Sequence, residues 1–179
     1  MNSWIVAMLA ALAIAIAIAA PAHATKTAGD VVDDNTINAS IKVALVTNKT
    51  TEAHRINVET YKGVVQLSGF VNSQAEKDEA TQVAASVSGV KEVKNSIAIG
   101  PSGSVGQKLD DSVTTGRVKA ALIDSKDVKS HQINVETNAG VVQLSGFVTS
   151  DAMRDSAARV AANVDGVKKV DNELMIKPH

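Results

Sequence analysis

The sequence predicts an α+β fold, built as a tandem repeat of an α-β-β-α-β module with two helices packed on one face of a three-stranded mixed sheet. The first observation behind this prediction is an internal repeat: residues 56–71 recur almost unchanged as residues 133–148, at an offset of 77 (133 − 56). The second is the spacing of apolar residues, which switches within each copy between a helical and an alternating period. We therefore expect two copies of one small domain.

An export signal is predicted before the first copy. Residues 5–20 are all apolar, and they are followed by Pro21 and the triplet Ala22-His23-Ala24. A run of this length that ends in small residues is typical of a secretory signal peptide, here residues 1–24, with cleavage after Ala24. An uncleaved anchor is the alternative, because the first four residues carry no basic side chain. Residues 25–33 are expected to form a flexible N-terminal segment.

Each copy is expected to begin with an amphipathic helix and a β-hairpin. In the first copy the apolar stripe of the helix consists of Ile37, Ile41, Ala44 and Leu45. Asp34 is placed to cap the N-terminus of this helix. The alternation of residues 56–71 predicts two strands with Gly63 between them. Gly63 and its counterpart Gly140 are expected to supply the positive φ that a short hairpin turn needs.

A second helix and a third strand complete each copy. In the first copy Ser73 and Glu76 form the S-x-x-E pattern of a capping box, and Gly89 ends the helix. Residues 93–99 then alternate again. Because a helix connects this strand to the hairpin, we expect it to join the sheet parallel to a neighbour, through a right-handed crossover. Six glycines are predicted to be structural: Gly63, Gly69, Gly89, Gly140, Gly146 and Gly166.

The repeat also sets the expected domain boundaries. Residues 34–99 form domain 1 and residues 111–176 form domain 2. Residues 100–110 begin with Gly-Pro-Ser-Gly-Ser and are expected to be a flexible linker. A domain this short has a marginal core, so docking of one copy on the other would stabilise both.

The composition excludes several kinds of function. The chain has no cysteine, which rules out disulfides, thiolate chemistry, cysteine-held metals and the acyl anchor of a bacterial lipoprotein. Its 18 basic and 19 acidic residues give a net charge of −1. A dedicated nucleic-acid-binding protein needs a cationic excess to contact phosphates, and this chain lacks one.

No catalytic, cofactor-binding or metal-binding site is predicted. The candidates for chemistry are three repeated pairs of polar residues: His54 and His131, Ser68 and Ser145, Glu59 and Glu136. The histidines belong to no metal-ligand spacing such as H-x-x-x-H, and the serines lack the G-x-S-x-G turn of a serine nucleophile. The glutamates occupy polar-facing strand positions. We therefore expect all six to be structural, and the protein not to be an enzyme.

Two surfaces are the candidates for contact with a partner. The first helix of domain 2 and the loop after it form the more cationic edge, and four basic residues there are expected to touch anionic lipid headgroups: Arg117, Lys119, Lys126 and Lys129. A solvated polar face is the alternative interpretation of this edge. The second surface is the sheet face that the helices leave uncovered, where the expected contact residues are Val64, Phe70, Val141 and Phe147. Such a half-apolar face would suit a protein partner.

Two repeated motifs resemble those of the BON family. The pattern V-x-L-x-G occurs at Val65–Gly69 and at Val142–Gly146, and the pattern G-V-x-x-V occurs at Gly89–Val93 and at Gly166–Val170. The resemblance covers both copies and includes the order α-β-β-α-β behind a signal peptide. It implies a periplasmic, non-lipidated protein of the osmotic or envelope stress response. It also implies weak, peripheral contact with phospholipid surfaces or, alternatively, a holdase-like chaperone or adaptor role toward unfolded envelope proteins.

Overall fold

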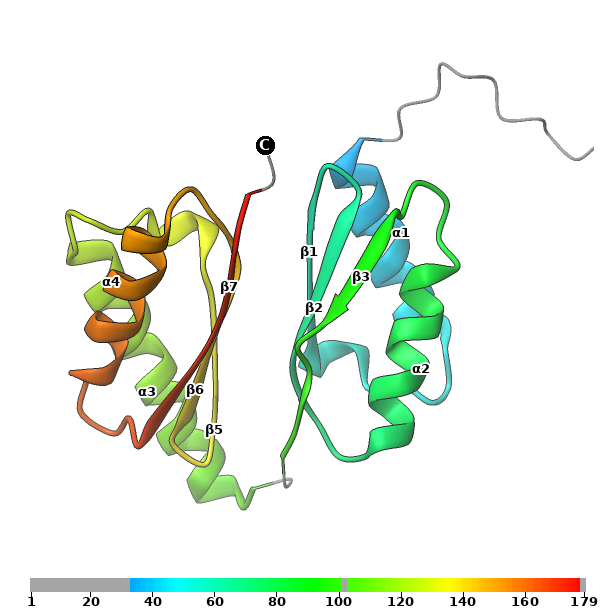
Figure 1. Cartoon of the computed structure of the whole chain (residues 1–179). Coiled ribbons are helices and arrows are strands. Elements are labelled where there is room, and N and C mark those ends of the chain that lie inside the picture. The colour runs from blue at the N-terminus through cyan, green and yellow to red at the C-terminus, as the bar shows by residue number, and fades with distance from the viewer. Residues whose placement is uncertain (1–32, 101–102, 178–179) are drawn as a thin grey trace, which may run out of the picture. The chain divides into compact units, whose positions relative to one another are not determined.

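The computed structural model describes residues 33–100 and 103–177, so the predicted signal peptide and nearly all of the N-terminal segment lie outside the described residues. Two modules follow one another along the chain (Figure 1). Module 1 comprises α1 (Asp34–Thr47), the 3-10 helix η1 (Ala53–Arg55), β1 (Ile56–Tyr61), β2 (Val64–Val71), α2 (Gln74–Ala85), β3 (Glu92–Asn95) and β4 (Ala98–Ile99). Module 2 comprises α3 (Val105–Asp124), the 3-10 helix η2 (Ser130–Gln132), β5 (Asn134–Asn138), β6 (Val141–Val148), α4 (Asp151–Ala162) and β7 (Lys169–Ile176).

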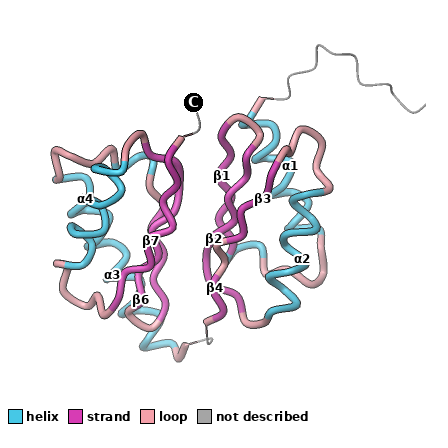
Figure 2. The backbone as a smooth tube through the Cα atoms, viewed as in Figure 1, coloured by secondary structure: helices cyan, strands magenta, loops and turns pink. Residues whose placement is uncertain are grey.

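The central strand of each sheet has one antiparallel and one parallel neighbour. β2 runs antiparallel to β1, with Val58 opposite Leu67, and parallel to β3, with Val65 opposite Val93. β6 pairs with β5 and β7 in the same two directions. Both helices of a module lie on one side of its sheet (Figure 2). The predicted α+β module and its parallel third strand are therefore confirmed.

The third strand is interrupted in module 1 and continuous in module 2. Between β3 and β4, the Asn95 Oδ1 atom accepts a hydrogen bond from Ile97 N at 2.9 Å. The equivalent bond in module 2, from Leu174 N to Asn172 Oδ1, is longer at 3.3 Å, and β7 runs through it. An asparagine that bonds the amide two residues on forms a local turn that competes with the strand ladder, so the shorter bond accompanies the break.

The hairpin turn of each module is held by a carboxylate from the first helix. The prediction that Asp34 is the N-cap is wrong. Asp33 holds the N-cap position of α1, and Asp34 is the first residue of the helix. Instead, the Asp34 carboxylate accepts hydrogen bonds from Lys62 N (2.6 Å) and Gly63 N (2.8 Å). Both turn residues have positive φ, 51° and 80°, with glycine at the predicted position. Successive amides in such a turn form an anion-binding concavity, which explains why the carboxylate lies there.

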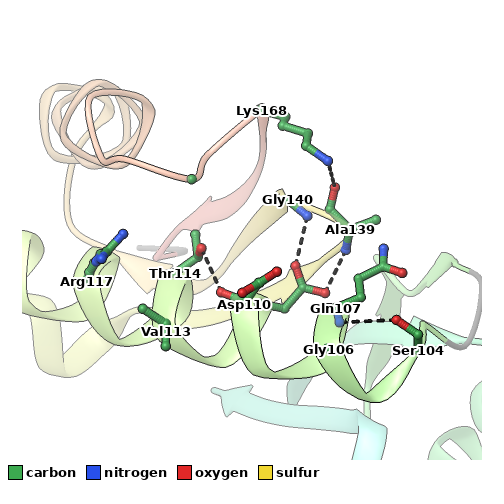
Figure 3. A pocket seen from close by; sticks show the side chains of 12 residues that line it. Ser104, Gly106, Gln107, Asp110, Val113, Thr114, Arg117, Ala139, Gly140 and Lys168 are labelled. Carbon is green, nitrogen blue, oxygen red and sulfur yellow. Dashed lines mark hydrogen bonds between the residues drawn. The ribbon is translucent and has the colours of Figure 1, made fainter.

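Module 2 repeats this arrangement, and it gives a testable prediction. The Asp111 carboxylate accepts from Ala139 N and Gly140 N, both at 2.9 Å (Figure 3). Replacing Asp111 with alanine leaves both amides without this acceptor, and we expect it to lower the free energy of unfolding by ~1–3 kcal/mol. Urea denaturation of the variant measures this loss. Asp110→Ala changes an exposed neighbour and should have an effect within about 0.5 kcal/mol; equal losses for the two variants would contradict the proposed role.

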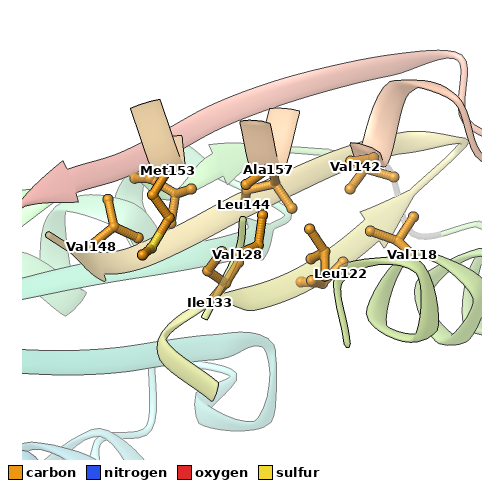
Figure 4. Packing of buried hydrophobic residues seen from close by; sticks show 12 residues of the cluster. Val118, Leu122, Val128, Ile133, Val142, Leu144, Val148, Met153 and Ala157 are labelled. Carbon is orange, nitrogen blue, oxygen red and sulfur yellow. The ribbon is translucent and has the colours of Figure 1, made fainter. Parts of the chain in front are cut away.

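Each module has its own hydrophobic core between its helices and its sheet. In module 2 the side chains that meet at the centre include Leu122, Leu144 and Ala157, each at most 1% exposed (Figure 4). The same three positions in module 1 hold Leu45, Leu67 and Ala80. The alanines let the second helix approach the sheet closely, and each large aliphatic side chain contributes ~1.5–3 kcal/mol when fully buried.

The second helix of each module begins at the predicted serine. Ser73 Oγ accepts a hydrogen bond from Glu76 N at 3.2 Å, and Ser150 caps α4 in the same way. The Glu76 carboxylate does not close a capping box on Ser73. It is buried and accepts from Asn72 N (3.2 Å) and Glu52 N (2.7 Å). It therefore ties the segment before η1 to the start of α2.

The second half of the predicted linker is helical. α3 begins at Val105, preceded by Ser104, whose Oγ accepts from Gln107 N at 3.3 Å. Residues 105–110 therefore belong to the helix rather than to a flexible linker. Val105, Leu109 and Val113 recur every four residues and extend the helical pattern upstream, which the Gly-Ser-rich start of the segment obscured.

Candidate functional site

The sheet faces that the helices leave uncovered are not open to solvent. Phe70 and Phe147, which the sequence predicts as contact residues for a partner, are only 8% and 6% exposed. Val64 and Val141 at the start of the same strands are half-buried. The expectation of an exposed partner-binding face is wrong for Phe70 and Phe147, because residues of the other module contact this face.

Buried glutamine and serine side chains connect the two modules. Gln143 Oε1 accepts a hydrogen bond from Gly69 N (2.6 Å), and Gln143 Nε2 donates to Ser96 O (2.7 Å). The hydroxyls of Ser68 and Ser145 meet at 2.7 Å. Burying these polar groups would be unfavourable without partners, and the bonds across the interface supply those partners.

The contacts made by module 1 mirror those made by module 2. Gln66 Oε1 accepts from Gly146 N (2.8 Å), and Gln66 Nε2 donates to Glu173 O (2.6 Å). Gln66 is 77 residues before Gln143, Gly69 is 77 before Gly146, and Ser96 is 77 before Glu173. Equivalent positions of the two copies therefore form equivalent bonds.

The repeated glutamates also belong to this interface. Glu59 Oε1 accepts from Asn134 Nδ2 (2.8 Å), and Glu136 Oε1 accepts from Asn57 Nδ2 (3.2 Å). Each carboxylate is half-buried and bonded to an amide of the other module. They thus have the structural role that was expected, but between modules rather than on an exposed strand.

An exposed apolar surface runs along α3. Val105, Leu109, Val113 and Ile123 are 78%, 64%, 53% and 68% exposed. With the exposed Gly116 and Ala120 between them, these residues fall on one side of the helix at 100° per residue, and we call this set the α3 stripe. The opposite side is buried in the module core: Thr114, Val118 and Leu122. The predicted start of domain 2 at residue 111 leaves out the first half of this surface, which is why it was not predicted.

Basic side chains border the α3 stripe. Helical geometry places exposed Lys108 and Lys119 along one border and exposed Arg117 along the other, where Asp110 and Asp124 also lie. Lys126 follows the end of α3 and Lys129 precedes η2, and both are exposed. Of the ion pairs found in residues 33–100 and 103–177, none involves the four predicted headgroup-contact residues. The structure thus brings Arg117 and Lys119 beside the stripe, with Lys126 and Lys129 beyond its C-terminal end.

The equivalent helix of module 1 is shorter and less basic. α1 begins at Asp34 and exposes Val43 and Val46, which are 64% and 72% exposed. These two residues correspond to Ala120 and Ile123 of α3 at the repeat offset. Lys119 corresponds to Lys42, whereas Arg117 corresponds to Ser40. The combination of a long apolar row with cations on both borders is therefore a feature of α3.

Three of the hollows found in the described residues adjoin α3. The first, of about 720 Å³, lies between α3 and the β5–β6 turn and includes Arg117, Lys168 and Asp111 (Figure 3). Asp111 is bonded to the turn amides, and Lys168 Nζ donates to Ala139 O at 3.1 Å, so neither charge is directed to a ligand. The second, of about 280 Å³, is mostly apolar and includes Leu122, Ile123 and other side chains beside Lys119. The third, of about 770 Å³, lies between α3 and Glu52, His54 and Arg55 of module 1.

The described part of the chain holds no group of three or more His, Cys, Asp or Glu residues that could bind a metal ion. His54 and His131 are exposed in η1 and η2. Ser68 and Ser145 bond each other rather than a base that could activate them. Within residues 33–100 and 103–177 there is also no helix with the length and apolar character needed to cross a membrane.

Comparison with known proteins agrees with this architecture. A family model described as the BON domain matches residues 33–101 and 110–178. The chain is 44% identical over 151 residues to the osmotically-inducible protein Y of Escherichia coli K12, covering 83% of this chain and 75% of that protein. It is 37% identical to a 21 kDa hemolysin of Actinobacillus pleuropneumoniae and 35% identical to the outer membrane lipoprotein DolP of Haemophilus influenzae, in each case over 81% of this chain and 75% of the relative.

Proposed function

Because the chain belongs to the BON domain family, and its relatives include an outer membrane lipoprotein, we propose that it is an exported, non-enzymatic envelope protein whose α3 stripe contacts anionic phospholipid. The periplasm is the proposed compartment. The relative named for osmotic induction supports a role in osmotic or envelope stress. No holdase role is proposed for the sheet faces, because each face is in contact with the other module.

The observation that carries the proposal is the α3 stripe, with Lys108 and Lys119 along one border and Arg117, beside Asp110 and Asp124, along the other. An exposed apolar row lowers its free energy by entering the boundary between headgroups and acyl chains, and cations beside it are attracted to anionic headgroups. Each basic side chain near such a surface contributes about 1 kcal/mol. The net charge of the whole chain is −1, so attraction is confined to this edge and the association is weak and peripheral.

Binding to vesicles of phosphatidylethanolamine and phosphatidylglycerol tests the proposal. The double variant Arg117→Gln/Lys119→Gln loses about 2 kcal/mol of electrostatic attraction, so we expect partitioning at low salt to fall roughly 10- to 30-fold. Raising the salt concentration should weaken vesicle binding by the unmodified chain until it approaches that of the variant, because exposed charges are screened. Leu109→Ser should weaken binding at every salt concentration, because it removes apolar contact. Co-sedimentation measures all three.

The matched control is Lys42→Gln, which removes the equivalent lysine of α1. This variant should bind within about twofold of the unmodified chain if α3 is the contact surface. Vesicles of phosphatidylcholine alone should bind little. Failure of the unmodified chain to sediment with anionic vesicles at low salt, or equal losses for the α1 and α3 variants, would overturn the proposal.

A further inference from the structure

We infer that the buried sheet face is self-complementary, and that a second copy of this chain can take the place of its own second module. In the resulting dimer, module 1 of each chain would pair with module 2 of the other. The inference concerns the face between the modules and does not depend on the lipid contact of α3.

The first support is that the two halves of the interface are built from nearly the same residues; Tyr61, whose ring lies 5.7 Å from that of Phe147, is an exception, because its equivalent is Asn138. β2 and β6 have the identical sequence VVQLSGFV, and each is the central strand of its sheet. The flanking positions that bond across, Asn57 and Glu59 on β1, are likewise Asn134 and Glu136 on β5. At these positions each module therefore presents the same donors and acceptors.

The second support is that the contacts are reciprocal. Gln66 bonds the Gly146 amide while Gln143 bonds the Gly69 amide, and the Ser68 hydroxyl meets its own counterpart, Ser145. Residue i contacting j while j contacts i is the rule for a twofold-symmetric interface between identical subunits. The two modules of one chain are thus arranged in the way that the two subunits of a homodimer are.

The third support is that neither core depends on the partner. The buried core of module 1 runs from Ile37 to Ile97, the core of module 2 runs from Val118 to Leu174, and the two share no residue. The centre of the pairing face is polar: Gln66, Ser68, Gln143 and Ser145. Separation of the modules would therefore leave both cores intact. It would expose the pairing face of each module, whose hydrogen-bonding groups can pair with the same face of another module.

A closed chain and an exchanged dimer contain the same number of interfaces per chain. The balance between them is then set by concentration, since a partner held on the same chain competes at an effective concentration on the order of 1 mM. Exchange should accordingly be rare in dilute solution and substantial at about 1 mM.

Cysteine pairs test the exchange in the full chain, which has no cysteine of its own. The Oγ atoms of Ser68 and Ser145 are 2.7 Å apart, so cysteines at these positions lie close enough for a disulfide. A Ser68→Cys chain is mixed with a Ser145→Cys chain that carries a size tag, opened in mild denaturant, returned to native buffer at about 1 mM and oxidised. We expect a mixed disulfide dimer, at a level several-fold above the control.

The control replaces the tagged Ser145→Cys chain with a tagged Ser86→Cys chain, whose thiol is exposed at the end of α2 and reports random collisions. The double variant Ser68→Cys/Ser145→Cys should form an internal disulfide in dilute solution. The inference is overturned if the mixed dimer does not exceed this control, or if the double variant fails to close. Light scattering gives an independent readout on the unmodified chain: a dimer fraction that rises toward 1 mM supports the inference, and a monomer at that concentration overturns it.

Discussion

Replacing Gly146 with alanine is expected to remove a large part of the stability of module 2. Gly146 has φ +121°, a conformation that side chains rarely adopt, and an added Cβ would lie 2.2 Å from the Gln132 carbonyl oxygen. That oxygen belongs to the backbone of η2, so it cannot swing away. Backbone strain of ~1–3 kcal/mol and a steric overlap of ~1–3 kcal/mol together give a loss of ~2–6 kcal/mol. This is a large part of the 5–15 kcal/mol that is typical of a whole domain.

Urea denaturation followed by circular dichroism measures this effect, and the chain provides a matched control of opposite sign. Gly116 lies in the exposed face of α3, and a Cβ there would meet nothing within 4 Å. Gly116→Ala should therefore stabilise the protein by up to about 1 kcal/mol, because alanine favours the helix. A Gly146→Ala variant that is within about 1 kcal/mol of the unmodified chain would contradict the argument.

The same geometry explains the glycine of the V-x-L-x-G motif in both copies. A Cβ on Gly69 would lie 2.0 Å from the Arg55 carbonyl oxygen of η1, as Gly146 would from Gln132. The 3-10 helix before the first strand thus crosses the central strand where only glycine fits. The sequence marks these glycines as structural, but it does not reveal which backbone atom excludes a side chain.

Periodicity predicted the elements of the fold because each element buries one face. The helical spacing of Ile37, Ile41 and Leu45 and the alternation of the hairpin both follow from packing against a single core. The prediction for Asp34 is wrong because its carboxylate bonds the amides of the hairpin turn instead of those at the N-terminus of α1. The concave pair of turn amides lies 28 and 29 residues away, and only the folded chain brings it to α1.

The pairing of the sheet faces could not be derived from periodicity, since alternation shows which residues leave the core but not what covers them. A signal did exist in the repeat itself. The outward positions Gln66 and Gln143 stand in strands that are identical over eight residues, whereas α1 and α3 differ in length and charge. Identical residues on the two sheet faces are consistent with contact between the modules. Different residues on α1 and α3 are consistent with separate contacts at the outer surfaces.

The interface itself is tested most directly by replacing Gln143 with leucine. Leucine has a similar size but cannot accept from the Gly69 amide or donate to Ser96 O. The Gly69 amide would then be buried without a partner, at a cost of ~1–3 kcal/mol to the docked state. Hydrogen exchange at that amide should accelerate by roughly 30-fold, the factor that corresponds to the middle of this range, about 2 kcal/mol. NMR of the full chain measures it.

Because the contacts between the modules are reciprocal, the mirrored substitution in module 1 should have an equivalent effect. Gln66→Leu should expose the Gly146 amide to exchange by a similar factor, because the two glutamines make equivalent bonds. The double variant should destabilise the docked state by less than the sum of the two single variants, since the first substitution already weakens the contact that the second one removes. Gln82→Leu, on the exposed face of α2, is the control and should leave both amides protected. Unchanged exchange at Gly69 in the Gln143→Leu variant would mean that the modules are not held together through this face.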